Sequence, residues 1–304
     1  MHKVKITLPA TLTNLGPGLN SLGLAVGLYT SIEISKRDDE SLVVETSGEG
    51  AGSYGTGLRH PVVLALMRIF QKQERAILGM NVKINNHIPL ESGLGAEAAF
   101  WVAGVIGANN LLGAGYNRET ILEIAADISH APDHTITTIL GGLTASVIHL
   151  DRLIHRSLPV TGLNLIMVLP EIENYAADVS RVKPERVSWN DAVHNLSRVP
   201  LLIEALRTGD LALIAQVIED RLYLPYLKTH IAGYDHVVEM ARRSGAQAIA
   251  LTGDGPAIIA FAPDNHKKIA TAMEVAFENS GVKARSWVLP IDNQGVVISV
   301  VQSS

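Results

Sequence analysis

The sequence contains no cysteine. Disulfides, thiolate metal sites and a cysteine nucleophile are therefore excluded, and a reducing compartment is compatible with this composition. A basic excess is also lacking, because 25 lysine and arginine residues stand against 30 aspartate and glutamate residues, for a net charge of -5. General nucleic-acid binders carry a surplus of positive charge that neutralises phosphates. We therefore expect no nucleic-acid partner.

Long hydrophobic runs are lacking as well. Residues 1–6 carry a short basic patch and are not followed by an apolar core of signal length. The most apolar window, residues 98–112, is interrupted by two glycines and two asparagines and is too short to span a bilayer. We interpret it as a buried helix, and we expect a cytoplasmic protein without a membrane partner.

What the chain does contain is enough apolar sequence for a substantial core. Hydrophobic residues make up 47% of its 304 residues and charged residues 18%, which is typical of folded proteins. Strand-like and helix-like patterns alternate irregularly, and this favours an α+β fold over a doubly wound sheet. Residues 151–162 show no periodicity, so we place a domain boundary there, with an N-terminal domain at 1–160 and a C-terminal domain at 161–304.

A glycine-rich segment leads directly into the apolar helix. Gly93 and Gly95 let the backbone turn tightly and approach a ligand closely. The helix that follows presents unpaired N–H groups and the positive end of its dipole, an arrangement that binds phosphate. The plain alternative is a helix entry that needs flexible residues. Residues 93–98 also fit the G-x-G-x-x-A dinucleotide fingerprint, but weakly, because the preceding strand is amphipathic and residues 86–92 intervene.

Two further segments indicate loops. Residues 9–25 are dense in Gly, Pro and Asn, which predicts an irregular loop or the connection of a β-hairpin. Residues 48–57 predict a mobile loop. Helices are predicted at 61–73, where Pro61 suits the first turn, and at 117–128, where Asn117 suits the N-cap.

Residues 129–134 interrupt the helical pattern and contain two histidines and an aspartate. His130, Asp133 and His134 are close in sequence, but three such residues in one loop are common by chance, so they only weakly indicate zinc. If the segment is helical, His130 and His134 share one face and could make ligand binding depend on pH. The simpler interpretation is a pair of solvent-facing histidines.

Three segments together resemble the motifs of the GHMP small-molecule kinases. The family patterns are P-A-T-x-x-N-L-G-P-G-F-D-S-L-G-L-A, P-x-x-x-G-L-G-S-S-A-A and S-G-x-G-P-T. The matching segments here are 9–25, 89–99 and 251–257, in the same order. Intermediate stretches are also similar to the family: 131–134 with 140–142, 195–198 and 219–226. The resemblance covers nearly the whole chain and is strongest to the homoserine kinases.

The resemblance implies a fold, cofactors and a reaction. The fold is an N-terminal, ATP-binding domain of the ribosomal S5 domain 2-like type followed by a ferredoxin-like domain. The cofactors are ATP and Mg²⁺. The reaction is transfer of the γ-phosphoryl group to the hydroxyl of homoserine, or a similar amino alcohol, on the route from aspartate to threonine. A homodimer is a further expectation, although no specific patch supports it.

The resemblance also assigns site residues. Asn14 and Asn20 are expected to face the substrate, with Arg198 and Arg221 at its carboxylate, which a guanidinium fork fits geometrically. For either arginine the alternative is a surface or interdomain salt bridge. The residues expected around the nucleotide are Pro89, Ser92, Gly93, Leu94, Gly95, Ala96, Glu97, Ala98, Gly253 and Gly255.

The chain departs from the family pattern within this site. Asn20 stands where the family usually has aspartate, which removes a carboxylate that could orient the attacking hydroxyl. Ala96 and Glu97 replace two serines of the phosphate loop, the second of which helps to hold Mg²⁺. The other departures are His134 for an asparagine, Ser129 for a metal-binding glutamate, His60 for an asparagine near the adenine pocket, and an added acid at Asp254.

These departures leave three hypotheses. In the first, Glu97 supplies the carboxylate and Ser129 the hydroxyl of an exchanged Mg²⁺ site, since Mg²⁺ takes one or two carboxylates beside phosphate oxygens and water. In the second, the chain is a degenerate homologue that binds an amino acid or a nucleotide without efficient transfer. The third is a kinase for a different small alcohol. No residue stands out as a general base, although charge stabilisation can suffice without one.

Overall fold

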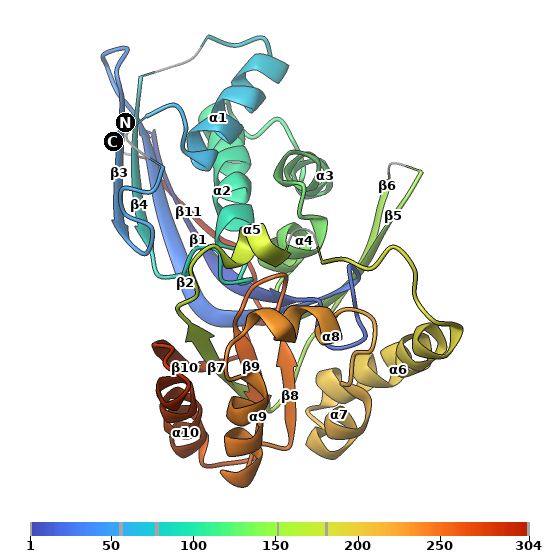
Figure 1. Cartoon of the computed structure of the whole chain (residues 1–304). Helices are drawn as coiled ribbons and strands as arrows, with labels where there is room; N and C mark the ends of the chain where they lie inside the picture. Colours follow the sequence, from blue (N-terminus) through green and yellow to red (C-terminus); the bar gives the residue numbers. More distant parts are fainter. Residues whose placement is uncertain (1, 55–56, 77–78, 151, 180–181, 303–304) are drawn as a thin grey trace.

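The computed structural model describes residues 2–54, 57–76, 79–150, 152–179 and 182–302. These residues form one seven-stranded sheet and one four-stranded sheet, each covered by helices. The structure is the two-domain α+β fold that the sequence predicts (Figure 1).

The first sheet has the order β11-β1-β2-β4-β3, and β5 and β6 extend it from β2. Val4, Ile6 and Leu8 alternate with less buried residues along β1, so one face of this strand enters the core. β1 and β2 pair antiparallel, whereas β3 and β4 pair in parallel. The strands are β1 (His2–Thr13), β2 (Leu22–Lys36), β3 (Leu42–Gly48), β4 (Met80–Asn86), β5 (Leu143–His149), β6 (Arg152–Leu158) and β11 (Val297–Gln302).

Four helices lie over this sheet (Figure 1): α1 (Pro61–Lys72), α2 (Ala96–Leu111), α3 (Arg118–Ser129) and α4 (Pro132–Leu140). Most of the α2 helix is apolar and buried, since it packs against α1, α3, α4 and β1. Two predicted helix starts are confirmed. Pro61 begins α1, and Asn117 caps α3 by accepting the Thr120 N–H at 2.9 Å.

The second sheet has the order β10-β7-β9-β8, with all neighbours antiparallel. Its strands are β7 (Asn164–Pro170), β8 (Ala248–Leu251), β9 (Ile258–Phe261) and β10 (Ala284–Pro290). The chain runs from β7 through a helical segment to β8 and β9, then through α10 to β10, which is the predicted ferredoxin-like order. The helices are α5 (Tyr175–Val179), α6 (Trp189–Thr208), α7 (Leu211–Val217), α8 (Leu224–Leu227), the 3₁₀ helix η1 (Lys228–His230), α9 (Tyr234–Arg243) and α10 (His266–Asn279).

A shared apolar core joins the two domains. Leu12 and Leu24 from the first sheet belong to the same buried cluster as Leu165 and Phe261 from the second sheet and Leu202 from α6. Close packing of this kind resists relative movement of the elements that contribute to it. Side chains from both domains can therefore be held at fixed distances in one site.

The prediction of an irregular loop over residues 9–25 is wrong at both ends. β1 continues to Thr13 and β2 begins at Leu22, so the connection is confined to residues 14–21. Pro9 is tolerated inside β1 because the pairing register shifts between Pro9 and Ala10, as at a β-bulge. The alternative of a β-hairpin connection is confirmed.

The structure differs from the expected local structure at several points between residues 129 and 158. The interruption predicted at 129–134 is short, because α4 begins at Pro132 and contains His134. His130 has φ 54° and caps α3, so His130 and His134 do not share a helical face. β6 lies inside the segment read as an aperiodic boundary, where it pairs with β5 as a hairpin.

The last strand returns to the first sheet. β11 pairs with β1 from His2↔Gln302 to Thr7↔Val297, so residues near both ends of the chain lie side by side. The predicted division at residues 160 and 161 stays a prediction, and this pairing adds a C-terminal strand to the first sheet.

Two remaining sequence predictions concern a loop and the membrane. Residues 49–54 form turns after β3, while residues 55–56 of the predicted mobile loop lie outside the described residues. No helix in the described part of the chain combines the length and apolarity that a bilayer crossing requires.

Candidate active site

Three glycine-rich segments meet at the N-terminus of α2. They cover residues 9–25, 89–99 and 251–257. The Thr13 N–H donates to Thr252 Oγ1 at 3.2 Å, and the Gly253 N–H donates to the Thr13 carbonyl at 2.7 Å. Thr252 Oγ1 in turn donates to the Gly93 carbonyl at 3.3 Å. Backbone groups of all three segments are therefore linked, although the segments are far apart in the sequence.

Glycine is required where the second and third segments touch. A Cβ at Gly255 would overlap the backbone of Ser92 and Gly93. A Cβ at Gly93, which has φ +79°, would overlap the Thr252 carbonyl. The sequence assigns Gly93, Gly253 and Gly255 to one site, and the structure brings these glycines together.

The first turn of α2 has no side-chain cap. Gly95 occupies the N-cap position with φ 75° and has no side chain to cap the helix, and no side chain among the described residues accepts a hydrogen bond from its first N–H groups. A Cβ at Gly95 would lie 2.7 Å from His134 Nδ1, so glycine is also needed for packing. Uncapped N–H groups at the positive end of a 16-residue helix suit an anion such as a phosphate.

A cavity of about 530 Å³ opens beside this junction. Thr13, Gly93 and Gly255 bring the three glycine-rich segments to its wall, and Asn14 and Asn20 line it. The backbone N–H of Asn20 donates to Asn14 Oδ1 at 2.8 Å, and this hydrogen bond orients the Asn14 side chain. The two predicted substrate-facing asparagines thus line the same cavity as Gly93 and Gly255.

His134 lines the cavity but is committed to the protein. Its Nδ1 lies 2.7 Å from Thr11 Oγ1 and its Nε2 lies 3.0 Å from Thr13 Oγ1. Burial lowers the pKa of His134, and the charges of Asp133 and Asp254 oppose this shift. Both nitrogens of the neutral ring are hydrogen-bonded to threonines of β1. The ring therefore holds the end of this strand in place and has no free nitrogen to act as a base.

The two predicted metal ligands have different surroundings. Ser129 Oγ lies 2.8 Å from Thr135 Oγ1 and accepts the Ala131 N–H at 3.2 Å, so it supports the turn between α3 and α4. Glu97 is exposed in the first turn of α2. Within the described ranges there is no group of three or more His, Asp or Glu side chains arranged to hold a metal ion. The metal role of Glu97 and Ser129 stays a prediction.

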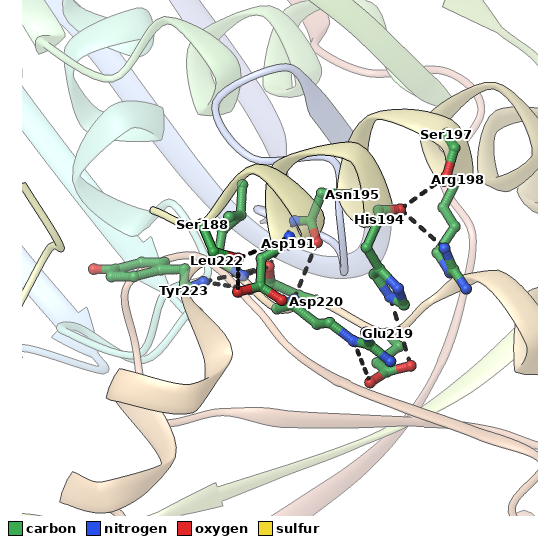
Figure 2. Close-up of polar contacts among 11 residues, drawn as sticks. Ser188, Asp191, His194, Asn195, Ser197, Arg198, Glu219, Asp220, Leu222 and Tyr223 are labelled. Atoms are coloured by element: carbon green, nitrogen blue, oxygen red, sulfur yellow. Dashed lines mark hydrogen bonds and ion pairs between the residues drawn. The ribbon is translucent and has the colours of Figure 1, made fainter. Parts of the chain in front are cut away.

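Arg198 lies in a polar cluster between α6 and residues 219–223 (Figure 2). Arg221 belongs to the same segment, where its N–H donates to Asn195 Oδ1 at 3.0 Å. Arg198 Nη1 donates to the His194 carbonyl at 3.0 Å, and Arg221 Nε donates to Glu219 Oε1 at 3.1 Å. Neither arginine is among the described residues that line the 530 Å³ cavity. Their role at a substrate carboxylate stays a prediction.

Sequence reasoning missed Lys183, which lines the cavity and pairs with Asp254 at 3.2 Å. It also missed the two threonines of β1 that hold His134. Lys183 lies in a segment without regular structure, where no periodic pattern marks it. A search for a cation that could balance the added acid at Asp254 is the one signal that could have drawn attention to it.

His60 lies in an aromatic group with Tyr54 and with Phe100 of α2. Its ring centre is 4.9 Å from those of Tyr54 and Phe100, and its Nδ1 accepts the Val62 N–H at 3.2 Å as the N-cap of α1. The side chain is fully buried, and this burial lowers its pKa to about 4. His60 is therefore neutral at physiological pH.

Stability should fall on the acid side because of His60. The unfolded chain takes up the proton near pH 6.5 and the folded chain only near pH 4, so stability is full above pH 6.5 and is lost toward pH 4. The total loss is about 3 kcal/mol. His60→Asn, which keeps an N-cap acceptor, should flatten urea-unfolding stability between pH 7 and 4.5. His87→Asn is the control at an exposed histidine. The prediction would be contradicted if the stability of His60→Asn fell with pH as steeply as that of the wild type.

The comparison with protein families matches both domains. The GHMP kinases N terminal domain matches residues 61–142, and the GHMP kinases C terminal domain matches residues 202–279.

Curated relatives match over nearly the whole chain. The homoserine kinase of Moorella thermoacetica is 34% identical over 96% of this chain and 99% of its own. That of Carboxydothermus hydrogenoformans is 32% identical over 97% of this chain and 96% of its own.

Solved structures agree with this. The homoserine kinase of Cytophaga hutchinsonii is 25% identical, with a TM-score of 0.86 over 98% of this chain and 97% of its own. The L. major mevalonate kinase is 15% identical, with a TM-score of 0.70 over 95% of this chain and 96% of its own, and it has the same fold. The chain belongs to the GHMP kinase family.

Proposed function

We propose that this chain transfers the γ-phosphoryl group of ATP to the hydroxyl of homoserine or a similar amino alcohol. The observation that carries the proposal is the meeting of three glycine-rich segments at the uncapped N-terminus of α2, beside a cavity lined by Asn14 and Asn20. The names of the curated relatives support the same acceptor.

The nucleotide phosphates would be held by backbone N–H groups between Gly93 and Ala98. These groups fit an anion because the helix start has no side-chain cap. Glu97 is negative and exposed in the same turn, so a bare triphosphate would be repelled there. A bound hard cation would offset this repulsion, and an exposed carboxylate such as that of Glu97 is a ligand that Mg²⁺ accepts. When bound, Mg²⁺ would neutralise charge on the transferring phosphoryl group.

The acceptor hydroxyl would be oriented by asparagines. Asn14 and Asn20 stand at fixed positions because each has a left-handed backbone and they are hydrogen-bonded to each other. A neutral amide can orient a hydroxyl but cannot take its proton. Acceleration would therefore come from positioning and from charge stabilisation of the phosphoryl group.

ADP release with homoserine, serine, threonine and a shikimate-like alcohol tests the proposal directly. We expect homoserine to give the fastest turnover. We also expect ATP to raise the thermal midpoint more with Mg²⁺ than without it, since ligands stabilise the state that binds them. Stabilisation by ATP without ADP release from any alcohol would instead identify a ligand-binding homologue that lacks transfer.

The exchanged metal site has a separate test in Glu97→Ala. We expect Mg·ATP affinity to fall about tenfold, while affinity for ATP without metal is unchanged or higher, because a repelling charge is gone. Glu119→Ala is the control, since Glu119 is an exposed acid in the first turn of α3. Unchanged Mg·ATP affinity in Glu97→Ala would count decisively against a metal role for this residue.

A further inference from the structure

An ion pair forms part of the cavity wall. Lys183 Nζ lies 3.2 Å from Asp254 Oδ2, and both residues line the cavity. Their side chains are 59% and 47% exposed, so each retains donors or acceptors that can reach a ligand. The pair connects the third glycine-rich segment to the irregular segment before α6. It therefore sets two opposite charges side by side where a substrate would lie.

The second oxygen of Asp254 is tied to the asparagines. Asn14 Nδ2 donates to Asp254 Oδ1 at 3.1 Å, and Asn14 Oδ1 accepts the Asn20 N–H at 2.8 Å. This series of hydrogen bonds fixes the carboxylate next to the residues that would orient the acceptor hydroxyl. A ligand group bound at Asp254 would therefore lie close to that hydroxyl.

A buried hydroxyl lies near the same carboxylate. Tyr175 is 3% exposed, and its hydroxyl has no hydrogen-bond partner among the described residues. Burial and then the charge of Asp254 raise the pKa of Tyr175, which keeps its proton available for donation. The next residue, Ala176, lines the cavity. A buried polar group without a partner is costly and is often completed by a ligand or by water.

The charges around the cavity favour an ammonium group. Carboxylates line it at Glu91, Asp133 and Asp254, whereas Lys183 is the one lysine or arginine among the described lining residues. A ligand with a carboxylate alone would meet more repulsion than attraction. A ligand with an ammonium group has a partner in Asp254, and a ligand with both charges also has a partner in Lys183.

We propose that Asp254 and Lys183 bind the two charged ends of an α-amino acid substrate. Asp254 accepts hydrogen bonds from the ammonium group, and Lys183 donates to the carboxylate, so that two charge-assisted contacts replace the ion pair. The cavity would then select alcohols that carry both charges over alcohols that carry only one. The inference rests on the proposed function for its substrate class. It differs from the sequence prediction, which gave the carboxylate to Arg198 and Arg221.

Calorimetric binding to the full chain tests this with three compounds. They are homoserine, 4-hydroxybutyrate, which lacks the ammonium group, and 3-aminopropan-1-ol, which lacks the carboxylate. In Asp254→Asn we expect homoserine and 3-aminopropan-1-ol to bind at least about tenfold more weakly, while 4-hydroxybutyrate is unchanged or tighter. In Lys183→Gln we expect homoserine and 4-hydroxybutyrate to weaken, while 3-aminopropan-1-ol does not.

Asp235→Asn is the matched control, because Lys228 and Asp235 form an ion pair of the same 3.2 Å separation outside the cavity. Equal weakening of all three compounds in Asp254→Asn, or no change in any, overturns the inference. Tighter homoserine binding in that variant also overturns it, since the ion pair would then be an obstruction. Charge-selective binding without ADP release would reject the proposed function and keep this inference. Turnover of homoserine without charge-selective binding would keep the proposed function and reject this inference.

Discussion

Gly255→Ala is expected to lower kcat/KM for homoserine phosphorylation by at least about 100-fold, because misplacing a reacting group by about 1 Å has an effect of this size. The added Cβ would overlap the backbone of Ser92 and Gly93. That backbone cannot yield freely, since Ser92 Oγ donates to the Pro89 carbonyl at 2.7 Å and Thr252 Oγ1 holds the Gly93 carbonyl. The glycine-rich loop would have to move as a unit away from its place before α2.

The same overlap should also destabilise the fold. Forcing an extra carbon into a close-packed contact costs about 1–3 kcal/mol. ADP release and the thermal midpoint are measured together, with Gly115→Ala as the control. A Cβ at Gly115 meets nothing nearer than Gln73 Nε2 at 3.9 Å, so that variant should behave as wild type. Wild-type kcat/KM in Gly255→Ala would show that contact between the second and third glycine-rich segments is not needed for catalysis.

Local spacing explains why much of this site could be predicted from the sequence. Gly93 and Gly95 are marked by their place between a strand and an apolar helix, and the need for glycine there is a property of the backbone itself. Motif order along the chain then implied a common site for the segments at 9–25, 89–99 and 251–257. Their hydrogen bonds in the structure agree with that expectation.

Long-range pairing explains what could not be predicted. Asp254 was visible as an added acid, but its partner Lys183 lies 71 positions away in a segment without periodicity. His134 appeared to belong to a break, whereas two threonines on β1, 121 and 123 positions away, hold its ring. β6 was missed because much of it is exposed, so its residues lack the apolar alternation of a half-buried strand.

Asp220→Asn is expected to destabilise the protein by about 4 kcal/mol, because Asp220 is a nearly buried acceptor that anchors a whole segment. Its Oδ1 accepts from Asn195 Nδ2 and the Leu222 N–H, both at 2.7 Å (Figure 2). Its Oδ2 accepts the N–H groups of Tyr223 at 3.0 Å and Leu224 at 2.7 Å. An amide replaces one of these oxygens by a donor, which would face other donors at short range.

The measurement is the thermal midpoint, which should fall by about 6 °C, because the unfolding entropy is about 2.1 cal/mol/K per residue and the chain has 304 residues. Asp210→Asn is the matched control with the same chemical change. Asp210 caps α7 by accepting the Leu213 N–H at 3.0 Å, and asparagine is an equally good N-cap, so its midpoint should hardly move. Equal small shifts in both variants would mean that water replaces the lost acceptor at Asp220. The segment that carries Arg221 would then be held by its packing against α6 rather than by this carboxylate.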